Sequence, residues 1–135
     1  MPQEANNPAD PSLRLAELRR NGAKDGIITI WLVGHSEARA NMRVRVGYLA
    51  KFPRVEWDKK HFHKIKNGDG LSELKWRAEG KEFRAAGYDY KGYFVMVLGF
   101  THKGTVYDPP RWLESAKKNR KDATDGRWEL VEFEA

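Results

Sequence analysis

The sequence predicts an α+β domain in which an N-terminal strand and two helices precede an antiparallel three-strand meander and a C-terminal helix. Three stretches of the chain support this class. Residues 26–33 (GIITIWLV) form a β-branched run of strand length, and residues 73–78 alternate between charged and apolar side chains within a predicted strand at 71–78. Residues 93–100 (YFVMVLGF) are apolar on both faces, which is typical of a covered central strand.

The chain is expected to begin with a polar segment and a short helix. Residues 1–10 are rich in proline and asparagine, which predicts disorder, and residues 11–135 are expected to form a single domain. An Asp-Pro pair at 10–11 is typical of a helix start, because aspartate caps the first amide groups and proline fits the first helical position. An Asn-Gly pair at 21–22 is typical of a helix end. We therefore predict a helix over about 11–21, before the strand at 26–33.

Two longer helices are predicted next. Ser36 is a suitable cap for a helix that Pro53 limits, and Asp58 is a suitable cap for another that ends at Asn67-Gly68. The first of the two has apolar residues at helical spacing, which predicts a buried stripe formed by Ala38, Met42, Val46 and Leu49.

The second half of the chain is expected to supply the meander. Strands are predicted at 71–78, 82–90 and 93–100, with a helix from about 110 to 120. The segment 128–133 (WELVEF) is read either as a final strand or as a docked tail. One sheet–helix core is expected to bury Ile28, Ile30, Met42, Val46, Phe62, Leu74, Trp76, Phe83, Val95, Val97 and Leu98.

The composition limits the classes of protein that this chain can represent. The 135 residues include no cysteine, which excludes disulfides, thiolate zinc sites and cysteine nucleophiles. No apolar run is long enough to span a membrane, and the N-terminus lacks the pattern of a signal peptide. We therefore expect a soluble, cytoplasmic protein that makes no membrane contact.

The charge is concentrated in the middle of the chain. The formal net charge is +6, but residues 39–127 carry 21 lysines and arginines against 11 aspartates and glutamates. A basic body of this kind favours a polyanionic partner, most simply nucleic acid. The alternative is an ordinary solvated surface with a lysine bias.

Four short motifs, in order along the chain, resemble the RelE/HigB-like toxins of the RelE/ParE superfamily, in a phage-derived branch. GLSELKW (70–76) and KEFRAAGY (81–88) resemble two consecutive strands of that family. VMVLGFTHK (95–103) resembles the following strand, and PPRWLESAKKNRKD (109–122) resembles the terminal helix. The resemblance is weak before residue 64.

The resemblance implies a RelE-like fold and the toxin of a type II toxin–antitoxin system. Such a toxin is a ribosome-dependent mRNA endonuclease, and it acts by transesterification without a metal or another cofactor. Its implied partners are a small cognate antitoxin protein, the ribosome and mRNA. Two alternatives stay open: a non-enzymatic protein that inhibits gyrase or binds nucleic acid, and a phage-derived interaction protein with a degenerate site.

The candidate catalytic residues are Lys75, Arg84, His102 and Lys103. Arg84 matches the family arginine and suits bidentate phosphate contact, although a cross-strand salt bridge with Glu73 is the simpler interpretation. His102 and Lys103 take the places of two family lysines, and a histidine can carry a proton near neutral pH. The candidate RNA-binding residues are Lys64, Lys66, Arg77, Tyr107 and Arg120. A metal site at HFHK (61–64) is not expected, because two histidines two residues apart on a helix face different directions.

Overall fold

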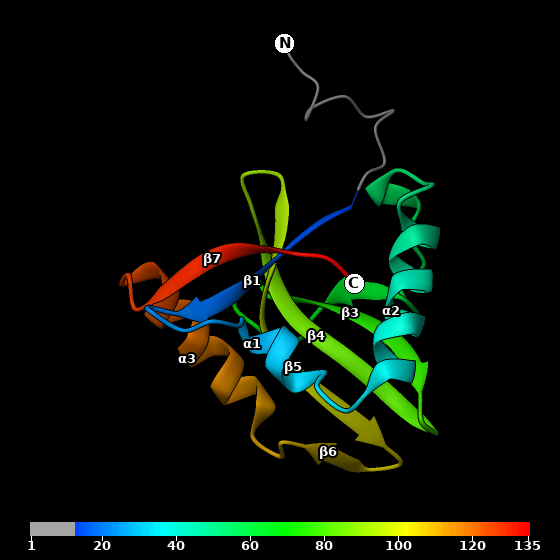
Figure 1. Cartoon of the computed structure of the whole chain (residues 1–135). Helices are drawn as coiled ribbons and strands as arrows, with labels where there is room; N and C mark the ends of the chain where they lie inside the picture. Colours follow the sequence, from blue (N-terminus) through cyan, green and yellow to red (C-terminus); the bar gives the residue numbers. More distant parts are fainter. Residues whose placement is uncertain (1–12) are drawn as a thin grey trace.

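Residues 13–135 form a seven-stranded mixed sheet with three α-helices (Figure 1). The computed structural model describes residues 13–135, so the predicted disorder of 1–10 lies outside the described residues. In chain order the elements are β1 (Arg14–Arg20), α1 (Ile27–Trp31), α2 (Ser36–Leu49), the 3-10 turn η1 (Arg54–Glu56), β2 (Phe62–Lys64), β3 (Ser72–Ala78), β4 (Lys81–Tyr90), β5 (Tyr93–Lys103), β6 (Val106–Asp108), α3 (Trp112–Thr124) and β7 (Trp128–Phe133).

The topology shows that the predicted RelE-like arrangement is wrong. The strand order is β2-β3-β4-β5-β1-β7, and β6 pairs with the far end of β5. The β1 strand pairs in parallel with β5 and antiparallel with β7, which makes the sheet mixed. In Figure 1, β7 (red) runs beside β1 (blue), so the last strand of the chain extends the sheet beyond the predicted meander.

The predicted first helix is the strand β1. Its side chains from Leu15 to Leu18 are all buried, because β1 lies between β5 and β7 and is covered on both faces. Leu15 pairs with Phe94 on one side and with Phe133 on the other. These distant pairings override the local helix signals at 10–11 and 21–22.

The predicted first strand is the helix α1, whose start is held by a side chain of β1. Glu17 is 3% exposed, and its carboxylate accepts hydrogen bonds from Ile28 N at 2.8 Å, Thr29 N at 2.9 Å and the Thr29 hydroxyl at 2.6 Å. A helix leaves its first amide groups without partners, and here a distant carboxylate satisfies two of them. The β-branched run therefore begins a helix instead of a strand.

The predicted helix from Asp58 to Asn67-Gly68 is also wrong, since this region forms a turn and the short strand β2, just after η1. Asp58 does cap the chain locally, but its side chain accepts from Lys60 N, two residues further on, at the start of a turn over residues 59–61. The following residues then pair with the edge of β3, where Phe62 lies opposite Leu74 and Lys75 N donates to His61 O at 2.8 Å. The two histidines of HFHK consequently belong to a strand region.

The later elements agree with the sequence patterns. The strands β3, β4 and β5 form an antiparallel meander, and the helices α2 and α3 lie close to their predicted ranges. Ala38, Met42 and Leu49 are buried on α2, with Val46 packed against them. The segment 128–133 is a strand, as one of the two interpretations proposed.

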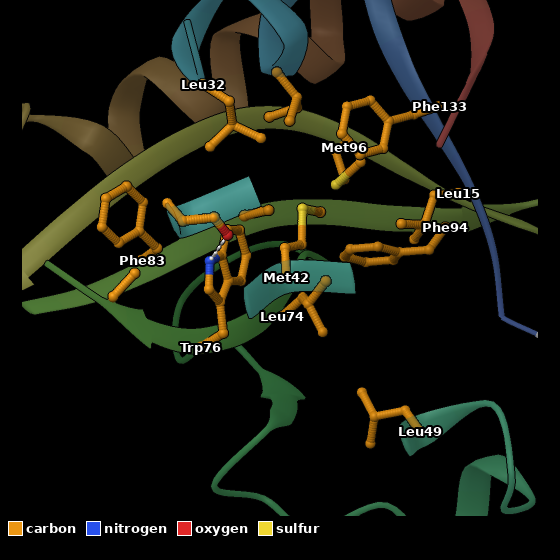
Figure 2. Close-up of a cluster of buried hydrophobic side chains, with 14 residues drawn as sticks. Leu15, Leu32, Met42, Leu49, Leu74, Trp76, Phe83, Phe94, Met96 and Phe133 are labelled. Carbon is orange, nitrogen blue, oxygen red and sulfur yellow. Dashed lines mark hydrogen bonds between the residues drawn. The ribbon is translucent and has the colours of Figure 1, made fainter. Parts of the chain in front are cut away.

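Two cores lie on the two faces of the sheet, where one was predicted. Figure 2 shows the first, in which Met42 lies near Leu74 and the indole of Trp76 donates a hydrogen bond of 2.9 Å to Ala38 O. The second lies under α3 and contains Val95, Val97, Phe100, Ala116 and Trp128. Ile30, expected in the core, is 58% exposed. We call the α1/α2 side the helix-pair face and the α3 side the α3 face.

Candidate functional site

A group of polar side chains lies on the α3 face, on the part of β3, β4 and β5 beyond the apolar contacts of α3. Strand alternation places it there, because Trp76 and Phe83 pair on the helix-pair face while Lys75 and Arg84 pair on the other. Glu82 lies opposite His102, and His102 lies opposite Tyr107 of β6. We name the set Glu73, Glu82, Arg84, His102 and Tyr107 the polar cluster.

Arg84 is the centre of the polar cluster. Its side chain is 14% exposed and donates through Nη1 to Glu73 Oε1 at 2.8 Å and through Nε to Glu82 Oε1 at 3.0 Å. Burial alone would lower the pKa of Arg84, but the hydrogen bond to Glu82 and the charges of Glu73 and Glu82 raise it above the ordinary value. The guanidinium is therefore charged and fixed in orientation, and the salt bridge to Glu73 anticipated from sequence is present.

The two carboxylates differ in exposure. The Glu73 side chain is 3% exposed, whereas that of Glu82 is 32% exposed. The hydrogen bond from Arg84 lowers the pKa of Glu82, so its carboxylate is ionised at neutral pH. Glu82 is therefore the carboxylate of the pair that solvent or a ligand can reach.

His102 lies beside Arg84 and is held by aromatic stacking. Its Nδ1 is 3.2 Å from Arg84 Nη2, and its ring stacks on Tyr107 with the centroids 4.2 Å apart and the planes 7° apart. A guanidinium can only donate, so Nδ1 is the acceptor and the ring proton lies on Nε2 in this arrangement. Tyr107 in turn stacks on Trp112 of α3, which connects the site to the second core.

Cationic and imidazole side chains surround the polar cluster. Lys75 is the direct cross-strand partner of Arg84, and the Arg77 guanidinium is 66% exposed and lies 3.7 Å from Glu82. His63 of β2 faces the buried carboxylate, with Nε2 3.6 Å from Glu73 Oε1. Around the polar cluster, three cationic side chains therefore accompany two carboxylates: Lys75, Arg77 and Arg84 with Glu73 and Glu82.

The structure brings most of the predicted site residues together, but not all of them. Lys75, Arg77, Arg84, His102 and Tyr107 share the α3 face near one another. Lys103 follows His102 in the strand and therefore points to the opposite face, where it is exposed. The remaining predicted residues lie elsewhere: Lys64 on the outer strand β2, Lys66 in the exposed turn after it, and Arg120 on α3, where it donates to Asp69 O and lies over the Tyr88 ring.

Glu73 was predicted only as a salt-bridge partner and Glu82 was not predicted as a site residue, because binding of a phosphate points to cations. The signal was nevertheless present. Residues 73, 75 and 77 share one side of β3, and residues 82 and 84 share one side of β4. Reading the same period for acids as well as for bases would have placed both glutamates beside Arg84.

The chemistry available here is that of ionised and proton-carrying side chains. Among residues 13–135, no group of three or more histidine, cysteine, aspartate or glutamate side chains is arranged to hold a metal ion. An accessible carboxylate, a fixed guanidinium and an imidazole lie within one hydrogen-bonded group. Such a group can accept a proton, stabilise negative charge and deliver a proton.

Comparison of the chain with family models, with curated proteins and with solved structures finds no match. No helix within residues 13–135 has the length and apolar character needed to cross a membrane.

Proposed function

We propose that the polar cluster cleaves RNA by transesterification. The observation that carries this proposal is Arg84, a charged guanidinium held between the accessible carboxylate of Glu82 and the imidazole of His102. Cleavage of this kind needs a base for the 2′-hydroxyl, an acid for the leaving oxygen and a cation at the phosphorus. Each of these roles has one candidate in the cluster.

The reaction assigns one step to each side chain. The Glu82 carboxylate takes the 2′-hydroxyl proton, and the 2′-oxygen attacks phosphorus. A bound phosphate competes with His102 Nδ1 for Arg84, which frees the imidazole to become protonated. The imidazolium then gives its proton to the 5′-oxygen as the P–O5′ bond breaks, and a 2′,3′-cyclic phosphate and a 5′-hydroxyl result. Arg84, assisted by Lys75, stabilises the additional negative charge on the non-bridging phosphate oxygens.

The biological setting that we propose is a toxin–antitoxin system, with mRNA on the ribosome as substrate. The four RelE/HigB-like motifs support this setting, and the basic middle of the chain suits an RNA partner. Production of the protein alone should then stop growth and produce mRNA cuts. A protein encoded by a flanking reading frame should bind it and restore growth.

A second candidate is a non-enzymatic nucleic-acid binder or inhibitor that retains the same surface. It is favoured by one observation: the charge of Arg84 is already neutralised by two carboxylates, which weakens its attraction for a phosphate. In an inert site this arrangement would serve only to stabilise the sheet.

Single-turnover cleavage of mRNA on programmed ribosomes, with RNA binding measured in parallel, separates the two. His102→Gln should spare binding and slow cleavage by ~10²–10⁴-fold, the usual contribution of a positioned acid. The matched control is His35→Gln, since His35 pairs with Glu79 and contacts Phe83 of the first core.

Arg84 provides the complementary test. Arg84→Ala should weaken binding and slow cleavage by ~10²–10³-fold. Because this change also leaves Glu73 buried without its guanidinium, Arg84→Lys should be compared, as it keeps the charge but loses the bidentate geometry. If the wild-type protein binds RNA but never cuts it, the proposal of an RNA-cleaving enzyme is overturned and the non-enzymatic binder is supported.

A further inference from the structure

An open groove of about 860 Å³ runs along the outer edge of the sheet, between η1 and β2. Side chains from both sides of β2 line it, because Phe62 belongs to the first core while His63 faces the polar cluster. The groove therefore follows the sheet edge from the helix-pair face toward the candidate site.

Arg54 forms a flat cationic surface in the groove. Its guanidinium lies 4.7 Å from the centroid of the Trp57 ring and 4.5 Å from that of Phe62. Two hydrogen bonds to Asp89, of 2.8 and 3.1 Å, fix its orientation, and 40% of the side-chain surface stays exposed. A planar guanidinium held in this way can stack against a nucleobase without further ordering.

The charge of the groove favours an anionic occupant. Within the described chain, the residues that line the groove include five lysines and arginines and one acid, Asp89. The carboxylate of Asp89 is paired with Arg54. Lys59, Lys60 and Lys64 are exposed and lie around the apolar floor. Lysine side chains around an apolar and planar floor match a chain of phosphates that carries flat bases.

The groove and the polar cluster share a boundary. Lys75 lines the groove and is also the cross-strand partner of Arg84. His63 lines it as well and lies 3.6 Å from Glu73. An RNA strand that extends from the polar cluster across β3 would therefore enter the groove directly.

We infer that this groove binds the single-stranded RNA segment next to the cleaved bond, with one base stacked on Arg54 and the neighbouring phosphates on Lys59, Lys60 and Lys64. The inference rests on the proposed function, since the bound strand is the one that the polar cluster would cut. It adds a base-binding subsite and a direction along which the strand leaves the cluster.

The test uses a short single-stranded RNA with 2′-O-methyl groups, which binds but has no free 2′-hydroxyl with which to be cleaved. Its affinity is measured against salt concentration for the full chain and for the triple variant Lys59→Ala, Lys60→Ala, Lys64→Ala. The plot of log K against log salt has a negative slope, and three lost phosphate contacts should make it less steep by roughly 2, at about 0.7 per contact. The matched control removes three lysines outside the groove: Lys24, Lys91 and Lys118.

The stacking subsite is tested with the same RNA lacking individual bases. Removal of the stacked base should weaken binding to wild type roughly 5- to 150-fold, if the Arg54 platform matches the range for a base on an aromatic side chain. Arg54→Lys keeps the charge and loses the plane, so it should retain the salt slope but no longer distinguish the intact strand from the abasic one.

The two proposals fail in different ways. Equal salt slopes for the groove triple variant and the control triple variant would overturn RNA binding in the groove. A second result would overturn it too: polyglutamate competes as well as RNA does, and abasic RNA binds as tightly as intact RNA. The second of these results would assign the groove to an acidic polypeptide. If the groove variants weaken binding but wild type never cuts mRNA on ribosomes, the groove stands and the nuclease fails.

Discussion

Each face of the sheet buries one carboxylate, and the two differ in what surrounds them. Glu17, on the helix-pair face, receives hydrogen bonds from two backbone amides and one hydroxyl. Glu73, on the α3 face, is bonded to a guanidinium and lies near an imidazole. Both are almost fully buried, at 3% and 2% exposure.

The difference separates a structural role from a chemical one. The partners of Glu17 are neutral and belong to the fold, so its charge serves to begin a helix. The partners of Glu73 are themselves charged or able to carry protons, and they continue into the accessible residues Glu82 and His102. Burial of a carboxylate therefore does not identify a site, whereas the chemistry of its partners does.

The strand β3 shows the same contrast in neighbouring residues, and Trp76→Ala should have the largest effect. Trp76 is 2% exposed and packs against Phe83 and Trp31, so its truncation should lower the free energy of unfolding by ~3–5 kcal/mol. Lys75→Ala, on the other face, should stay within ~0.5 kcal/mol. Urea unfolding of both variants measures the difference. A loss below about 1 kcal/mol at Trp76 would contradict the assignment of this face as the core.

The Glu17 carboxylate should come second. Glu17→Ala leaves the first amide groups of α1 without partners, and hydrogen bonds to a charged group contribute ~1.5–3 kcal/mol. The same unfolding measurement should show a loss in this range. Glu56→Ala, which removes an exposed carboxylate in η1, is the matched control and should be nearly neutral. Equal effects of the two substitutions would mean that the start of α1 does not depend on Glu17.

The sequence predicted β3 better than β1, and the reason is where the stabilising partners lie. In β3 the apolar residues Leu74, Trp76 and Ala78 are buried as the alternation predicts, and the partner strand β4 follows directly along the chain. The partners of β1 are β5 and β7, far along the chain, so a local reading of residues 11–21 could not find them. The same limit hid α1, whose start depends on a side chain of β1.

The candidate site was predictable in part for a similar reason. Lys75, Arg84 and His102 share a face because strand alternation and antiparallel pairing of adjacent strands place them there. Lys103 was chosen by resemblance alone, and alternation places it on the other face. The path of the groove beside η1 and β2 was not predictable, since residues 58–67, which include β2, were expected to be a helix.

A third prediction uses pH to compare the accessible carboxylate with its replacement. The pKa of Glu82 in the folded protein is below its ordinary value of 4.5, because of the hydrogen bond from Arg84. Its stabilising contribution is therefore fully present above about pH 4.5 and is lost as pH falls through the lower folded value. Relative to Glu82→Gln, wild type should be more stable by ~0.5–1 kcal/mol at neutral pH.

Thermal unfolding from neutral to acidic pH measures this difference. The advantage of wild type should stay constant down to about pH 4.5 and disappear below it. An advantage that grew with acidity would reverse the expected sign and exclude the Arg84 hydrogen bond as the cause of the shift.

The smallest effect on stability is expected at Arg77. Because its removal should hardly affect folding, Arg77 tests whether the α3 face binds RNA and the helix-pair face does not. Its guanidinium is 66% exposed and lies 3.7 Å from Glu82, so Arg77→Ala should change the free energy of unfolding by less than ~0.5 kcal/mol. It nevertheless shares a face with Lys75 and Arg84, and one lost phosphate contact should lower the salt slope for single-stranded RNA by about 0.7. Lys81→Ala, at the start of β4 beside the Phe83 ring, removes the same charge from the helix-pair face and should leave the slope unchanged. If both substitutions made the salt dependence less steep by the same amount, RNA affinity would depend on the net charge of the protein. That result would contradict the assignment of the α3 face as the binding surface.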